Sequence, residues 1–200
     1  MCSSGPDSTT GLLLRFAATG NTQDFRAIHD RYRPIVLGWA IRCGFTREEA
    51  EDIAQETLLR VADNADRFDP KRGSTSAWLL SIARRCLQDA ARSHQRERNR
   101  QTLPESRWAE LAGHDDLAAR WEQECRQTVL ARAVDGLRRS TRCDEKTIAA
   151  FIRFALQEES AQSIARDLGL SVEQVYVAKS RCVDHIRPLL ERLQAEYELE

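Results

Sequence analysis

Residues 160–175 read SAQSIARDLGLSVEQV, and this stretch predicts two short helices joined by a tight turn. Ser160 and Ser171 are residues typical of helix N-caps, and Gly169 stands where a chain leaves a helix in a left-handed conformation. Four apolar residues at helical spacing would form the shared core: Ile164, Leu168, Leu170 and Val175. The pattern predicts a helix-turn-helix, whose second helix enters the major groove of DNA.

The outward face of this second helix carries the candidate contacts to bases and phosphates. Its side chains are Glu173, Gln174, Tyr176, Val177, Lys179, Ser180 and Arg181. An ordinary helical hairpin with a glycine turn is the alternative interpretation of this stretch.

Upstream, apolar residues again recur at intervals of three and four, and no strand is expected. One stripe runs from Phe25 to Cys43, where Pro34 predicts a kink or a break into two helices. The next helix opens at Thr46, with Glu49 placed to complete a capping box. Its expected buried stripe is Ala50, Ile53, Ala54, Thr57, Leu58 and Val61.

The opposite face of that helix lies in an acidic stretch, residues 47–69, and forms one candidate interaction surface. Its members at offsets of three and four are Asp52, Gln55, Glu56 and Leu59. A plainly solvated helix face is the alternative.

The stretch from Asp69 to Ser76 has turn composition and feeds a helix expected from Ala77 to about His94. Here the charge balance is basic, which suits a nucleic-acid backbone and unstacked bases. The candidate side chains are Lys71, Arg72, Ser74, Arg84, Arg85, Gln88, Arg92 and Arg96. A soluble Arg-rich helix is the alternative, and Trp78 is expected in the core.

Net charge, hydropathy and cysteine content exclude several classes of function. The 200 residues carry a formal net charge of −1, which argues against a general polycation that coats nucleic acid. No apolar run is long enough for a bilayer span and no signal peptide is recognisable, so we expect a cytoplasmic protein without membrane insertion. The six cysteines are dispersed without a C-x-x-C pair and are expected in the core. We expect no bound metal, no cofactor and no catalytic residue.

Three segments in one order carry a resemblance to a known family. They are EDIAQETLL at 51–59, RFD at 67–69 with AWLLSIAR at 77–84, and SIA at 163–165 with AKSR at 178–181. Together they resemble the extracytoplasmic-function (ECF) class of bacterial RNA polymerase sigma factors, in the sigma-70 family, which has only the σ2 and σ4 domains. The resemblance spans about Asp24 to Leu190.

The resemblance implies an all-α, non-enzymatic initiation factor with a σ2-like helical bundle and a σ4-like helix-turn-helix domain joined by a flexible linker. The expected ranges are an N-terminal extension (1–20), the σ2-like domain (21–96), the linker (97–114), the σ4-like domain (115–190) and an acidic tail (191–200). Pro188 is expected to interrupt the terminal helix, and the tail to project away from DNA.

Roles and partners follow from the resemblance as well. The face with Asp52, Gln55, Glu56 and Leu59 would bind the β′ clamp helices of core RNA polymerase. The loop and basic helix would read and melt the −10 element of promoter DNA, and the second helix of the helix-turn-helix would read the −35 element. A monomer is expected, with an anti-sigma factor as a further partner.

The chain departs from the family at the start of its last helix, where QVYVA at 174–178 replaces a common T-V-K-S-R. The promoter sequence therefore cannot be carried over. Two alternatives stay open: a standalone, dimeric helix-turn-helix regulator, and a sigma-mimicking protein that binds an anti-sigma factor but not polymerase.

Overall fold

The computed structural model describes residues 5, 7–98, 114–140 and 143–199, and the side chains of 94–98 and 114–115 lie outside that description. Within these ranges the chain forms helices and no strand, as predicted. None of the described helices is both long and apolar enough to cross a membrane. The chain divides into two compact units, one of Met1–Thr128 with Ala195–Glu200 and one of Val129–Gln194.

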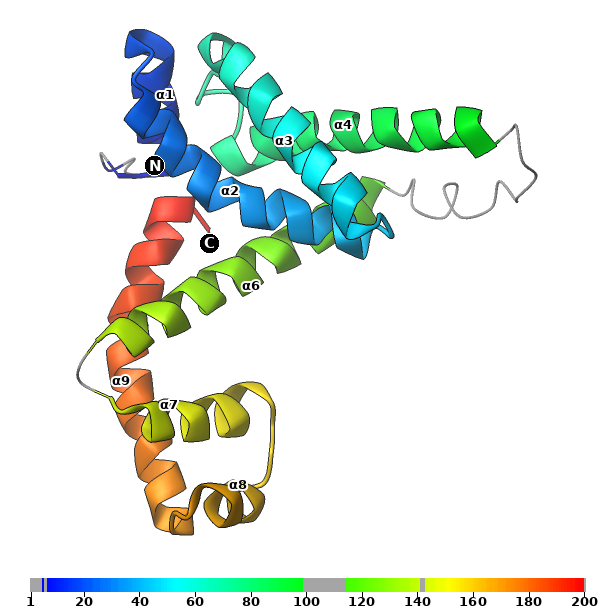
Figure 1. Ribbon diagram of the computed structural model, residues 1–200. Helices are drawn as coiled ribbons and strands as arrows, with labels where there is room; N and C mark the ends of the chain where they lie inside the picture. Colours follow the sequence, from blue (N-terminus) through cyan, green and yellow to red (C-terminus); the bar gives the residue numbers. More distant parts are fainter. Residues whose placement is uncertain (1–4, 6, 99–113, 141–142, 200) are drawn as a thin grey trace. The chain divides into compact units, whose positions relative to one another are not determined.

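The first unit is built on three helices that pack side by side, with α3 lying across α2 and α4 (Figure 1). The elements of this unit are α1 (Thr9–Thr19), α2 (Thr22–Arg42), α3 (Arg47–Asp63), the 3-10 turn η1 (Ala65–Arg67), α4 (Thr75–Arg98) and the first part of α6 (His114–Arg139). Ile28, Ile35 and Trp39 of α2 are fully buried. This core holds α3 and α4 in place and leaves their outer faces exposed.

Helix α3 matches its prediction closely. Thr46 accepts a hydrogen bond from the Glu49 backbone N–H, and the Glu49 carboxylate accepts one from the Thr46 N–H, so the capping box is present. The buried residues of α3 are Ala50, Ile53, Ala54, Thr57, Leu58 and Val61, which confirms the predicted stripe.

Both prolines expected to disturb helices lie inside continuous ones. Helix α2 runs through Pro34, so the predicted break is wrong, and α9 (Val172–Tyr197) runs through Pro188, so the predicted interruption is wrong. Both proline side chains are exposed, so their rings pack on the solvent side, where the carbonyl that lacks its helical partner can bind water.

Helix α4 begins two residues earlier than predicted and ends later, at Arg98. Its start is fixed by Ser74, whose hydroxyl accepts a hydrogen bond from the Ala77 N–H at 3.2 Å. Leu79, Ile82, Ala83 and Cys86 face the core, whereas Trp78, expected in the core, is only half-buried. Trp78 instead packs on Phe68 at a ring distance of 5.3 Å.

Segments outside the expected σ2-like range also contribute to the first unit, among them α1, which lies in the expected N-terminal extension. Trp121 of α6 is 2% exposed and meets Trp39 edge-on at 5.6 Å, and the Trp39 indole N–H donates to the Leu117 carbonyl at 3.1 Å. At the C-terminus, Tyr197 is 1% exposed, and the Glu198 carboxylate accepts a hydrogen bond from the Thr10 N–H at 3.0 Å. The compact units therefore divide the chain differently from the domain ranges that the sequence suggested.

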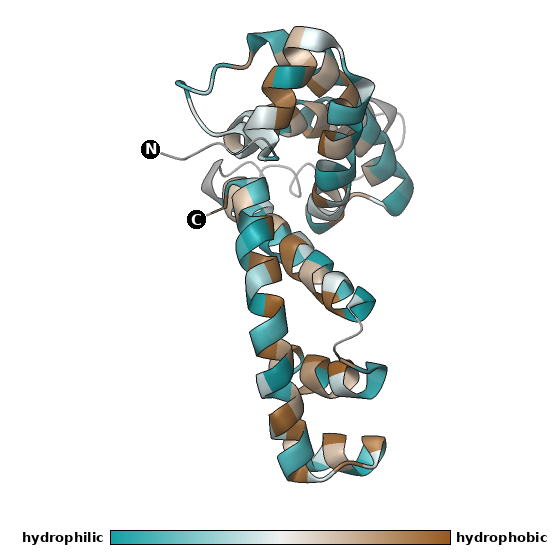
Figure 2. Cartoon of the chain, turned by 90° about the vertical axis from the view of Figure 1, so that its left-hand side faces the viewer, coloured by the Kyte–Doolittle hydropathy of each residue, from teal (hydrophilic) through white to brown (hydrophobic). Residues whose placement is uncertain are grey.

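The second unit contains the helix-turn-helix. It is formed by the rest of α6, α7 (Glu145–Phe151), the π-helix η2 (Ile152–Leu156), α8 (Ala161–Leu168) and α9 up to Gln194. Ser160 caps α8, and Gly169 ends it in a left-handed conformation with φ of 61°, as predicted. Figure 2 shows hydrophobic residues interspersed with hydrophilic ones along α8 and α9, as expected for amphipathic helices.

The core of the helix-turn-helix confirms the sequence prediction. Ile164 and Val175 are fully buried, and Leu168 and Leu170 pack against them while partly buried. The Leu170 N–H donates to the Ala165 carbonyl at 2.8 Å, which closes the turn between α8 and α9. The turn therefore fixes the start of α9 and the direction of its outward face.

Candidate functional site

The predicted acidic face is present on the outer side of α3. Asp52, Gln55, Glu56 and Leu59 are all exposed, and Leu59 is 53% exposed, which is high for a leucine. Asp52 and Gln55 make no side-chain hydrogen bond or ion pair with any other described residue. This face is a row of polar groups around an exposed apolar side chain.

Two hollows border this face. One, of about 380 Å³, lies between α2 and α3 and is lined by His29, Asp52, Gln55 and Leu59 among others. The other, of about 360 Å³, lies between α3 and α4 and is lined by Asp52 and Glu56 among others. Asp52 belongs to both, so the face is the ridge between two grooves rather than a flat helix surface.

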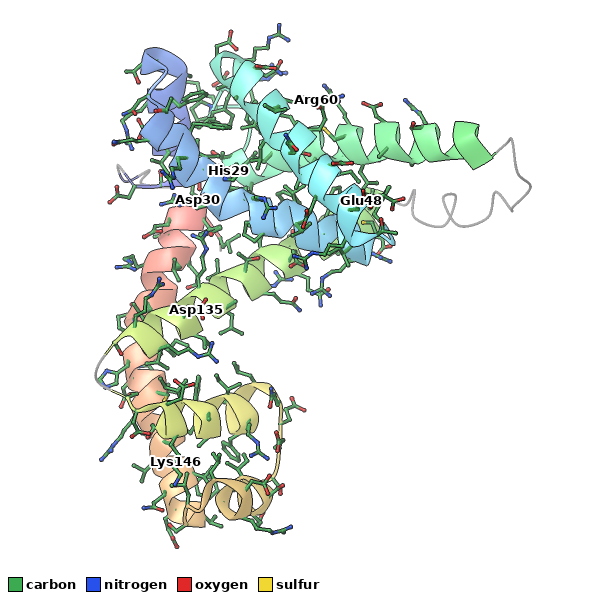
Figure 3. The ribbon with its side chains drawn as sticks, in the orientation of Figure 1. His29, Asp30, Glu48, Arg60, Asp135 and Lys146 are labelled. Carbon is green, nitrogen blue, oxygen red and sulfur yellow. The ribbon has the colours of Figure 1, made fainter. Side chains whose placement is uncertain are left out.

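Arg60, which is labelled in Figure 3, links the acidic face to α4 through two ion pairs. Its guanidinium contacts Glu56 at 2.7 Å and Asp89 of α4 at 3.0 Å. These hydrogen bonds, to Glu56 first and then to Asp89, raise the pKa of Arg60. The bridge neutralises part of the charge of Glu56 and leaves Asp52 as the less compensated carboxylate of the face.

The loop before α4 forms one wall of a hollow of about 480 Å³. The Asp69 carboxylate accepts a hydrogen bond from the Lys71 N–H at 2.9 Å, which folds the loop as an Asx turn. Lys71, Arg72 and Ser74 are exposed on it, and Arg72 and Ser74 line the hollow. Their predicted place beside the basic helix is thereby observed.

Aromatic and basic groups share this hollow. Its lining includes the apolar side chains Phe68, Trp78 and Ile82 and the basic side chains Arg67 and Arg85. No role was predicted for Arg67, Phe68 or Asn64 from the sequence, although Arg67 and Phe68 belong to the RFD motif at 67–69. Apolar walls with cationic edges fit a nucleobase with its phosphate.

The predicted basic side chains of α4 occupy different environments. Arg85, Gln88 and Arg92 are exposed, but Arg92 lies 3.9 Å from Asp89. Arg84 is half-buried, and its Nε is buried without a hydrogen-bond partner among the described residues. A further hollow, of about 440 Å³, is lined by Arg84, Arg85 and Gln88 among others. Arg96 belongs to α4, but its side chain lies outside the described part.

The candidate contacts on α9 all lie on its exposed side. Glu173, Tyr176, Val177, Lys179, Ser180 and Arg181 are exposed as predicted. Gln174 is exposed too, but its side-chain oxygen accepts from the Ser171 N–H at 2.7 Å, and the Ser171 hydroxyl accepts from the Gln174 N–H. Gln174 therefore completes a cap on α9, a role that the sequence analysis did not assign to it.

Comparison with known proteins connects this geometry to a family. Residues 28–97 match Sigma-70 region 2, a range that contains α3, the loop, most of α2 and nearly all of α4. The match covers 70 of the 200 residues, so it shows what this part of the chain is similar to. The relatives that the chain resembles include ECF RNA polymerase sigma factors.

Three relatives show how far the similarity extends. SigK of Mycobacterium sp. (strain KMS) is 36% identical over 99 residues, which is 48% of this chain and 51% of SigK. RpoE of Cereibacter sphaeroides is 26% identical over 162 residues, covering 81% of this chain and 86% of RpoE. SigL of Mycobacterium tuberculosis (strain ATCC 25618 / H37Rv) is 28% identical over 183 residues, covering 89% of this chain and 93% of SigL. The match to the SigK relatives thus spans about half of their length.

Proposed function

We propose that this chain is a sigma factor that binds core RNA polymerase and directs initiation at specific promoters. The observation that carries the proposal is the folded unit of α2, α3 and α4, which matches Sigma-70 region 2 and presents an acidic ridge on α3 and an aromatic, basic hollow beside α4. Two such surfaces on one small unit suit two partners, a protein and a nucleic acid.

The acidic ridge is the proposed contact to the β′ clamp helices of core RNA polymerase. Asp52, Gln55 and Glu56 supply charged and polar groups, and Leu59 supplies an exposed apolar anchor that a protein partner can bury. The opposite face of α3 is already buried, so binding through this ridge needs no rearrangement of the helix.

The hollow between the loop and α4 is the proposed site for the −10 element. A base that leaves the stack costs a few kcal/mol, and an aromatic wall formed by Phe68 and Trp78 offsets part of that cost. Arg72 and Arg85, which line the same hollow, would contact the neighbouring phosphates. The outward face of α9 is the proposed reader of the −35 element.

The remaining partners and properties are part of the same proposal. Such a factor works in the cytoplasm, where RNA polymerase acts, needs no cofactor and catalyses no reaction of its own. It would join core polymerase as a single copy, and an anti-sigma factor that covers the acidic ridge would keep it inactive.

The proposal is tested by transcription with purified components. Core polymerase and this chain are incubated with genomic DNA fragments of the source organism and nucleotides, and the 5′ ends of the transcripts are sequenced. We expect discrete start sites that share two upstream elements at a fixed spacing. Start sites that match those of core polymerase alone would contradict the proposal and favour a standalone regulator or a sigma-mimicking protein.

A further inference from the structure

After the exposed polar residues Glu173 and Gln174, the outward face of α9 carries two large apolar side chains, which is unusual for a surface that faces DNA phosphates. Tyr176 is 52% exposed and Val177 is 47% exposed, on adjacent positions of the helix. Phe154 of η2 packs against Tyr176 edge-on, with ring centroids 5.4 Å apart and ring planes at 87°. We call Phe154, Tyr176 and Val177 the apolar ledge.

Phe154 fixes the position of the ledge. It packs on the buried core of the helix-turn-helix while remaining partly exposed, so its ring is anchored on one side and available on the other. The edge-to-face contact restricts the rotation of the Tyr176 side chain. The Lys179 ammonium lies 5.4 Å from the centre of the Phe154 ring, so Phe154 contacts both Tyr176 and the first cation of α9.

The surroundings of the ledge favour DNA over a protein as its partner. Lys179, Ser180 and Arg181 follow within the next turn of α9 and are exposed, so the ledge is continuous with groups that bind phosphate. A stable protein interface buries about 800 Å² on each partner, which is far more than the side chains of this ledge can supply.

The major groove offers one apolar group to such a ledge. Among the edges of the four bases there, only thymine carries a methyl group, and the other groups are hydrogen-bond donors and acceptors. Resting on the proposed function of α9 as the −35 reader, we propose that Tyr176 and Val177 recognise thymine methyl groups of the −35 element, with Phe154 as the positioning residue for Tyr176.

Replacement of thymine by uracil tests this directly, because it removes the methyl group and leaves base pairing intact. A promoter is selected from random duplexes with the reconstituted holoenzyme, and each −35 thymine on both strands is then replaced by uracil in turn. At one or two positions we expect binding to weaken roughly fourfold, as for the loss of one buried methyl-sized group.

Substitutions in the ledge test whether these side chains cause the weaker binding of the uracil duplex. In Tyr176→Ala and Val177→Ala holoenzymes, we expect the thymine and uracil duplexes to bind equally well at the affected position. Phe154→Leu should reduce the difference between the two duplexes, and Phe154→Tyr, which keeps the ring, should preserve it. Leu156→Ala is the control, because Leu156 is 41% exposed on the same π-helix but outside the ledge, and its holoenzyme should keep the full difference.

The outcomes separate this inference from the proposed function. Promoter-specific binding in which no uracil matters would overturn thymine reading and leave the sigma assignment standing. The ledge would also lose its DNA role if Tyr176→Ala left promoter binding intact but abolished binding of a protein partner. A failure to select any promoter would instead count against the proposed function itself.

Discussion

Buried thiols set the response of the first unit to alkaline pH. Burial raises the pKa of Cys43 from its ordinary value of 9.0 to about 11, and that of Cys125 from 9.0 to about 12. A pKa that is higher in the folded state stabilises the fold fully below pH 9, and this contribution is lost as the pH rises toward the folded-state values. We therefore expect the free energy of unfolding to fall above pH 9.

Urea denaturation in the presence of a reductant, at pH 8 and pH 10, measures this fall. A Cys43→Ala/Cys125→Ala variant should show a shallower fall over the same range, although it will be less stable at both pH values because its core is packed less completely. If the free energy of unfolding fell by the same amount in the variant and in the unmodified protein, the thiols would not be the cause of the fall.

The exposure or burial of a single residue was predictable where helical periodicity determines which side of the helix it occupies. The exposure of Asp52 and Tyr176 and the burial of Ile164 follow from apolar spacing alone. The half-burial of Arg84 did not follow, because it depends on neighbours brought close by the fold. Arg67 and Phe68 were missed as hollow-lining residues for the same reason. The capping bond of Gln174 was missed, although Ser171 and Gln174 have the local spacing of a capping box.

At the scale of elements, the turn between α8 and α9 depends on the backbone conformation of one glycine. Gly169 has φ of +61°, a conformation that strains residues with a Cβ, and only the end of the Lys146 side chain, at 3.9 Å, would meet an added Cβ. Gly169→Ala should therefore cost about 1 kcal/mol of stability in the second unit through backbone strain. Gly169→Asn should cost less, because asparagine tolerates this conformation better.

Hydrogen exchange of the α8 and α9 amides in the two Gly169 variants measures that difference. Equal losses of protection in the two variants would show that crowding, rather than backbone conformation, limits this position.

The loop before α4 and α4 itself should act as one DNA-binding element. Arg72 and Arg85 come from the two segments but line the same hollow. In holoenzyme binding to promoter DNA, Arg72→Ala/Arg85→Ala should lower the slope of log affinity against log salt by about two, because two phosphates are no longer neutralised. Arg126→Ala/Arg138→Ala removes two exposed arginines from α6 and is the control. A slope that stays constant in both variants would exclude the hollow as a DNA surface.

The sequence predicted most elements because their ends carry their own signals. Thr46, Ser160 and Ser171 cap helices as expected, and Gly169 ends one. The interruptions predicted at the two prolines were wrong. A proline on the solvent side of a helix costs less free energy than the packing of that helix contributes. Residues 99–113 of the expected linker lie outside the described part of the chain.

At the scale of the whole molecule, the C-terminal residues are part of the core of the first unit. Tyr197 packs on Tyr32 with ring centroids 5.9 Å apart, and its hydroxyl donates to the Arg31 carbonyl at 3.4 Å. Tyr197→Ala should therefore lower the free energy of unfolding by about 3 kcal/mol, as expected for a large buried ring. Tyr197→Phe, which removes only a long hydrogen bond, should cost about 1 kcal/mol or less.

Urea denaturation followed by tryptophan fluorescence checks the Tyr197 variants. Unchanged stability in Tyr197→Ala would mean that the terminus does not support the first unit. The acidic tail was expected to project away from DNA, because four glutamates dominate residues 191–200. The partners of Glu196 and Glu198, which include Arg31 and Thr10, lie more than 160 residues away along the chain, and no local pattern reveals them.

The central claim is that the ridge on α3 binds core RNA polymerase. Gel filtration of the purified chain with bacterial core polymerase tests it, with Asp52→Arg/Glu56→Arg beside the unmodified protein. The control is Asp66→Arg/Glu122→Arg, which makes the same change in charge at exposed positions outside α3.

We expect the unmodified chain and the control to elute with core polymerase, and the ridge variant to bind on the order of tenfold or more weakly while keeping its helical circular dichroism. Equal binding by all three proteins, or no binding by the folded, unmodified chain, would contradict the account.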